Sequence, residues 1–137
     1  MTNGIGSVLA GRRVESVTGG ARLDITLAGA VTVRVTHEFR FAVPSGVERF
    51  YPALTVRPSG PLLGLVGRSV GAARVTMAGG LELAFDGGGE LSVPPHALVA
   101  PWSVFTPGGT VCSGLPGGEV AWAEPEPRRP GRWFTTG

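Results

Sequence analysis

The chain is built of short runs in which apolar and polar residues alternate. The two clearest runs carry their apolar residues at Leu23, Ile25 and Leu27 and at Leu81, Leu83 and Phe85. A period of two places one set of side chains on a core and the other in water, as in a half-buried β-strand. Gly (23) and Pro (12) separate the runs, and no window shows a convincing period of 3.6 residues. The pattern therefore predicts an all-β protein of many short strands.

The hydrophobic pattern occurs twice. The matching positions that open the two copies are Leu9, Gly11 and Val14, and Leu65, Gly67 and Val70. A three-stranded meander with one apolar face cannot bury that face alone, but two meanders can cover each other. We therefore expect copies at about residues 9–43 and 65–97, as two antiparallel meanders related by a pseudo-twofold axis. They would form a small sandwich or a partly closed barrel.

Length and composition indicate one folded domain. The 137 residues are 42% hydrophobic and 16% charged, which is enough apolar material for a core without disulfides. We expect a single β domain at residues 1–123, followed by a Pro- and Arg-rich tail at residues 124–137. Pro125, Pro127 and Pro130 disfavour a regular strand ladder there.

Charge and cysteine usage exclude several classes of function. All twelve basic residues are arginines, and they are interspersed with ten acids, so the pI near 9.5 does not reflect a basic stripe for nucleic acid. No apolar run is long enough for a membrane span, and the N-terminus does not resemble a signal peptide. The single cysteine fits a reducing compartment. We expect a cytoplasmic protein with no nucleic-acid or membrane partner.

The longest alternating run, residues 31–43, is interrupted on its apolar side by His37. One straight strand of this length would exceed about 40 Å. We therefore expect a bend or bulge near His37–Glu38, a feature that is frequent beside functional sites, and a His37 ring that is at least half buried. Two interpretations stay open: a structural histidine bonded to the backbone, or a ligand-binding or acid–base residue.

Other chemistry-bearing residues give weaker signals. His37, His96 and Cys112 lack the paired spacing of metal ligands, so we expect no metal site and no cofactor. Cys112 with either histidine would supply a nucleophilic pair, but the surrounding C-S-G turn has no signature of such enzymes. A buried or turn thiol is the simpler interpretation.

The second half of the chain also carries a recurring order of core and turn residues. They are Gly67 and Val70, then Leu81, Leu83 and Phe85 with Asp86–Gly87, then Trp102, then Pro116–Gly117–Gly118 with Trp122. Over about residues 9–123 this order resembles an uncharacterised family of short two-repeat β proteins, common in actinobacteria. The chain departs from that family at Ala100–Pro101, where an acidic residue and Ala are usual. The resemblance implies no established activity, although some members resemble immunity proteins, which neutralise a toxin by binding it.

No catalytic constellation is present, which favours a non-enzymatic binding or accessory module that acts through a protein surface and is immunity-like in the sense of the resemblance. Trp133 and Phe134 are its candidate docking residues, either on their own domain or on a protein partner. The alternative is a β-barrel for a small apolar ligand: a carrier, or a cyclase or isomerase that works by pocket shape. Its candidate pocket residues are His37, Glu38, Arg40, Tyr51 and Trp102. A third hypothesis is the building block of a symmetric oligomer such as a homodimer.

Overall fold

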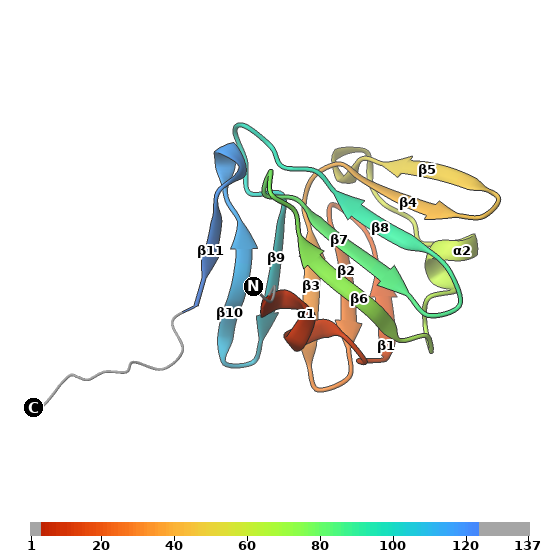
Figure 1. The fold of residues 1–137 in the computed structure, drawn as a ribbon. Helices are drawn as coiled ribbons and strands as arrows, with labels where there is room; N and C mark the ends of the chain where they lie inside the picture. The colour runs from red at the N-terminus through yellow and green to blue at the C-terminus, as the bar shows by residue number, and fades with distance from the viewer. Residues whose placement is uncertain (1–3, 124–137) are drawn as a thin grey trace, which may run out of the picture.

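The computed structural model describes residues 4–123, which are mostly β and form two antiparallel sheets (Figure 1). The first sheet has the strand order β1-β2-β3-β9-β10-β11, and the second has the order β5-β4-β8-β7-β6. The strand bounds are Val14–Thr18 (β1), Leu23–Leu27 (β2), Val31–Val35 (β3), Phe39–Val43 (β4), Gly46–Phe50 (β5), Val70–Val75 (β6), Leu81–Phe85 (β7), Glu90–Val93 (β8), Trp102–Thr106 (β9), Gly109–Gly114 (β10) and Val120–Trp122 (β11).

Four short helical segments, which the alternation did not predict, accompany the sheets. They are α1 (Gly4–Leu9), the 3₁₀ turn η1 (Pro52–Leu54), α2 (Gly60–Leu63) and the 3₁₀ turn η2 (Pro116–Gly118). Each has six residues or fewer, which is too short for a period of 3.6 to stand out in a sequence. Within residues 4–123, no helix is long and apolar enough to cross a membrane.

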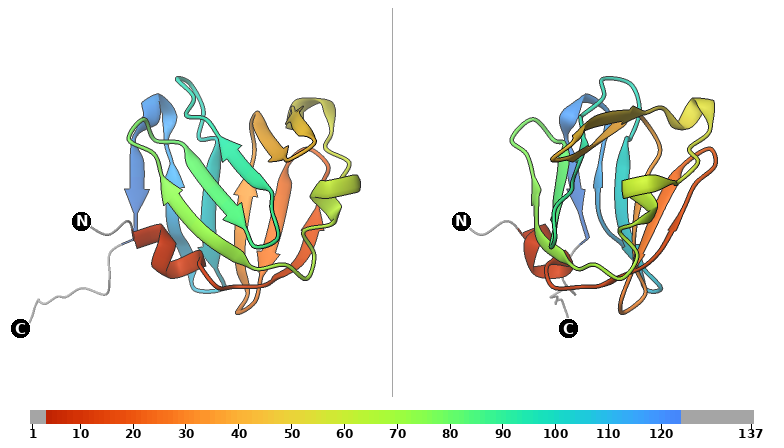
Figure 2. Two further views of the ribbon diagram at one scale, coloured as in Figure 1. Left: turned by 45° about the vertical axis from the view of Figure 1, so that its right-hand side comes forward. Right: turned by 90° about the vertical axis from the view of Figure 1, so that its right-hand side faces the viewer.

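The two sheets face each other as a sandwich, without closing into a barrel (Figures 1 and 2). The apolar residues of the alternating runs fill the space between the sheets. The six residues of the two clearest runs, Leu23, Ile25, Leu27, Leu81, Leu83 and Phe85, are at most 5% exposed. The predicted burial of this face is therefore confirmed.

The two copies form equivalent local structures, the meanders β1-β2-β3 and β6-β7-β8. Each meander follows a glycine with positive φ, Gly11 at 83° and Gly67 at 92°. The first strand of each meander shifts register against the second strand at equivalent places. The shift follows Val14 in the β1–β2 pairing and Val70 in the β6–β7 pairing. The repeated sequence thus encodes a repeated local geometry.

Reciprocal hydrogen bonds join the starts of the two copies. The bonds are Val14 N to Arg68 O (2.7 Å), Val70 N to Arg12 O (2.9 Å), Gly11 N to Val70 O (2.7 Å) and Gly67 N to Val14 O (2.9 Å). Moving each residue to its counterpart in the other copy converts the first bond into the second and the third into the fourth. A self-complementary contact of this kind is what a local twofold axis generates.

The hairpins that follow the two meanders are exchanged between the sheets, which the sequence did not reveal. Hairpin β4-β5 comes after β3 in the chain but adds to β8, and hairpin β9-β10 comes after β8 but adds to β3. The expected bend at His37 is present, because the chain leaves β3 at Val35 and enters β4 at Phe39. This bend carries the chain from one sheet to the other.

Candidate functional site

His37 lies in the β3–β4 crossover, and its ring packs against His96 in the β8–β9 crossover. The ring centroids are 4.1 Å apart and the planes are inclined by 56°. Both residues are partly buried, and His37 is more than half buried as expected. The structure thus brings together two histidines that are distant in the sequence, at the place where the two exchanged connections meet.

The surroundings of this pair are mostly backbone. His96 Nδ1 accepts a hydrogen bond from the Leu98 N–H (3.0 Å), so a neutral His96 carries its proton on Nε2. The His96 carbonyl accepts from the Gly117 N–H (2.8 Å). Within residues 4–123, no group of three or more His, Cys, Asp or Glu side chains is close enough to hold a metal ion. Packing between the crossovers is the role that these contacts support.

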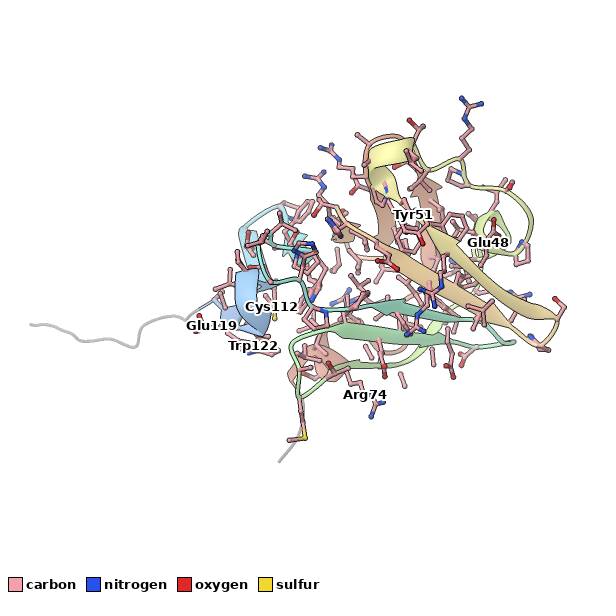
Figure 3. The ribbon with its side chains drawn as sticks, turned by 90° about the horizontal axis from the view of Figure 1, so that it is seen from above. Glu48, Tyr51, Arg74, Cys112, Glu119 and Trp122 are labelled. Carbon is pink, nitrogen blue, oxygen red and sulfur yellow. The ribbon has the colours of Figure 1, made fainter. Side chains whose placement is uncertain are left out.

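The other candidate pocket residues lie in different environments. Glu38 pairs with Arg49 at 3.4 Å, on the exposed side of the β4-β5 hairpin. Arg40 is exposed and stands beside Arg49 in the ladder. Tyr51 is 44% exposed, just after β5 (Figure 3). Trp133 and Phe134, the candidate docking residues, lie outside the described residues.

Trp102 is a core residue with a fixed partner. It is 1% exposed, and its indole N–H donates to the Gly79 carbonyl at 3.1 Å. A Cβ added at Gly114 would lie 2.5 Å from the indole nitrogen, and one added at Gly118 would lie 2.5 Å from the Ala78 carbonyl oxygen. The tryptophan and the Pro-Gly-Gly turn therefore hold the β6–β7 turn against the end of β10.

Cys112 is fully buried on β10, and desolvation raises the pKa of its thiol to about 12. The thiolate is the reactive form, so we expect Cys112 in the folded chain to resist a thiol reagent at pH 8 and to react once guanidinium unfolds the protein. Because folding raises the pKa of this thiol, the free energy of unfolding is unaffected by it below about pH 9. It falls as the pH rises from about 9 toward 12, where the unfolded chain ionises the thiol and the folded chain keeps it protonated. Rapid labelling of the native chain would contradict this assignment.

His37 lines neither of two open hollows that lie on the described surface. The larger, of about 430 Å³, lies over β6, β7 and β8 on the outer face of their sheet. Its floor includes Ala72 and Ala84, and the Arg74–Glu82 ion pair borders it. This face combines small side chains with paired charge; Ser92 is its hydroxyl residue, neither His nor Cys lines the hollow, and no metal-binding cluster lies there among the described residues.

The smaller hollow, of about 190 Å³, lies beside β5. Phe41, Val43 and Pro61 line it together with residues 45–48. Glu48 stands opposite the buried Phe41 in the ladder, so its side chain points to the inner face of the sheet. Its carboxylate makes no hydrogen bond or ion pair with residues 4–123. A hollow of mixed polar and apolar lining therefore lies beside the Glu48 carboxylate at this edge, where Figure 3 labels Glu48.

β5 is the open edge of the second sheet. Its first four residues are exposed, including Val47 at 64%. The opposite edge, β6, is covered by α1, and β1 at the edge of the first sheet is tied to other segments at both ends. β11, the remaining edge, has only three residues. β5 is thus the longest uncovered strand edge among the described residues.

The hairpin geometry identifies the free backbone groups of this edge. Only Pro44 and Ser45 separate the paired residues Val43 and Gly46, so this pair exchanges its hydrogen bonds within the hairpin. Antiparallel ladders alternate bonded and non-bonded pairs. Val47 therefore directs its N–H and C=O away from β4, and every second residue after it does the same.

Within residues 4–123, these features define a β-sandwich made of two meanders with exchanged hairpins, whose longest open strand edge is β5. The chain belongs to the family of unknown function DUF6188, whose model matches residues 5–124. No curated protein and no solved structure matches the chain. The family match covers both meanders and both hairpins, β5 included.

Proposed function

We propose that this protein is a non-enzymatic binding module that recognises an extended segment of a protein partner by strand addition to β5. The observation that carries the proposal is a difference between the two sheets. The exchanged hairpins β9-β10 and β4-β5 extend the two sheets in the same way, and β10 carries an added strand, β11, along its outer edge. Within residues 4–123, β5 carries none.

The site can provide both affinity and selectivity. In strand addition, backbone hydrogen bonds supply affinity, and pockets for alternate side chains supply specificity. β5 offers free backbone groups at Val47 and Arg49, and its inner side has the Glu48 carboxylate and the hollow to which Phe41, Val43 and Pro61 contribute apolar surface. The partner segment that fits has a Lys or Arg opposite Glu48, with an apolar residue two positions along.

Charge also disfavours direct pairing of two β5 strands. The antiparallel register that would pair all five residues of β5 with those of a second copy places Glu48 opposite its own counterpart. Like charges directly opposite each other destabilise a ladder. A complementary strand is therefore preferred over an identical one.

The alternative, a barrel for a small apolar ligand, has less support. It would use a pocket containing His37, whereas the two sheets are not closed and the core between them is occupied by side chains. The His37–His96 contact is compatible with a packing role instead. We expect His37→Leu to leave strand addition unchanged.

Strand addition can be tested by selecting heptapeptides from a random library for binding to the full chain. We expect selected peptides to alternate and to carry Arg or Lys on the same face as an apolar residue. Val47→Pro removes an edge N–H and adds a clashing ring, so it should weaken the Kd of such a peptide by about tenfold or more. Isothermal titration calorimetry measures this change.

Matched variants distinguish the loss of the β5 binding edge from a general loss of the fold. Val47→Thr keeps the N–H and the β propensity, so it should bind the peptide normally. Glu48→Lys should weaken binding, whereas Glu119→Lys, which reverses an exposed carboxylate near β11, should not (Figure 3). Equal binding by Val47→Pro and Val47→Thr chains, both folded by circular dichroism, would refute strand addition at β5.

A further inference from the structure

We propose that residues 131–134 of one copy add antiparallel to β5 of a second copy, so that the protein associates through its own C-terminal segment. This inference rests on the proposed function, since it names an occupant for the same edge. The segment has the sequence G-R-W-F and contains no proline, unlike residues 124–130. It can therefore offer a continuous set of backbone donors and acceptors.

The side chains of the segment match the edge position by position. With Arg132 opposite Glu48, the antiparallel register places Phe134 opposite Gly46, which has no side chain. Phe134 then enters the hollow next to β5, which Phe41 and Pro61 line. Arg132 and Phe134 are two residues apart and share one face, as the site requires.

The opposite face of the added strand matches as well. Trp133 falls opposite Val47, whose side chain is 64% exposed. Pairs of aromatic and β-branched residues are favourable across neighbouring strands. In this register the backbone of Trp133 also exchanges hydrogen bonds with the N–H and C=O groups that Val47 directs away from β4. One register thus satisfies the charge, the hollow and the exposed valine.

The length of the linking residues 124–130 favours binding to β5 of a second copy over binding to β5 of the same chain. β11 and β5 lie at opposite ends of the molecule (Figure 1). Residues 124–130 span at most about 25 Å when fully extended. The six strands of the first sheet alone, spaced about 4.8 Å apart, are about 24 Å wide, and an intramolecular path would also have to pass around them. Two copies can exchange segments reciprocally, which closes a dimer with twofold symmetry.

Charge reversal tests this inference on the full chain by sedimentation velocity. The unmodified chain should show a concentration-dependent dimer. Glu48→Arg and Arg132→Glu, each alone, should weaken dimerisation at least tenfold because each places like charges opposite each other. Glu119→Lys is the matched control and should dimerise normally. A monomer at all concentrations for the unmodified chain would overturn the inference.

Mixing the two variants distinguishes exchange between copies from closure within one chain. In an equimolar mixture, the strand of each variant meets a tail of opposite charge from the other, so a heterodimer should form at the affinity of the unmodified chain. A mixture that stays monomeric would show that the C-terminal segment of one copy does not bind β5 of the other, and would overturn the inference.

The peptide assay separates this inference from the proposed function. A selected peptide should still bind the Arg132→Glu chain and should dissociate the unmodified dimer. If this peptide binds β5 but neither charge reversal changes association, the inference is wrong and strand addition stands. If the peptide fails to bind the Arg132→Glu chain, both are wrong.

Discussion

Trp102→Ala is expected to lower the free energy of unfolding by about 3–5 kcal/mol, the usual cost of removing a large buried aromatic side chain. Trp102 is 1% exposed on β9 and stands opposite Val35 of β3, where the exchanged hairpin joins the first sheet. Its removal leaves a cavity and also leaves the Gly79 carbonyl without the indole donor. Guanidinium denaturation measures the loss.

Trp122→Ala is the matched control for this change. Trp122 is 45% exposed on the edge strand β11, so its truncation should cost much less than that of Trp102. Equal losses for the two variants would show that the indole of Trp102 does not anchor the join between the hairpin and the sheet.

Leu83→Ala is expected to cost about 2–5 kcal/mol because Leu83 is 1% exposed at the centre of β7. Ile25 occupies the corresponding place in β2 and is also fully buried. Ile25→Ala should therefore destabilise the protein by a similar amount. Chemical denaturation with an unchanged m-value would show that both meanders belong to one cooperative unit. Two separate unfolding transitions would contradict the shared core.

The alternation of apolar and polar residues predicted the local features of this fold, namely which face of a strand is buried and where a strand ends. The buried faces of β2 and β7 follow directly from their apolar residues, and the break at His37 follows from a run too long for one strand. The exchange of hairpins did not follow, because alternation tells which face of a strand is buried but not which strand it joins. β4 and β9 both present apolar inner faces, at Phe39 and Val104 for example, and either pattern suits either sheet.

The candidate site was harder to predict for physical reasons. The contact of His37 with His96 depends on two crossovers meeting in space, and no spacing in the sequence encodes it. β5 does not stand out in the sequence, because Glu48 occupies the inward position where alternation would require an apolar residue. An inward-pointing charge is a property of edge strands, and this signal could have marked β5 as an edge.

The central claim, that β5 accepts a partner strand, is tested most directly by amide hydrogen exchange of the full-length Arg132→Glu chain, whose own C-terminal segment should leave β5 free, with and without a selected peptide. Without the peptide, the Glu48 N–H should exchange slowly because it is bonded within the hairpin, whereas those of Val47 and Arg49 should exchange fast. With the peptide bound, Val47 and Arg49 should become protected while Glu48 stays as it was. Unchanged exchange at Val47 and Arg49 in the saturated complex would contradict the account.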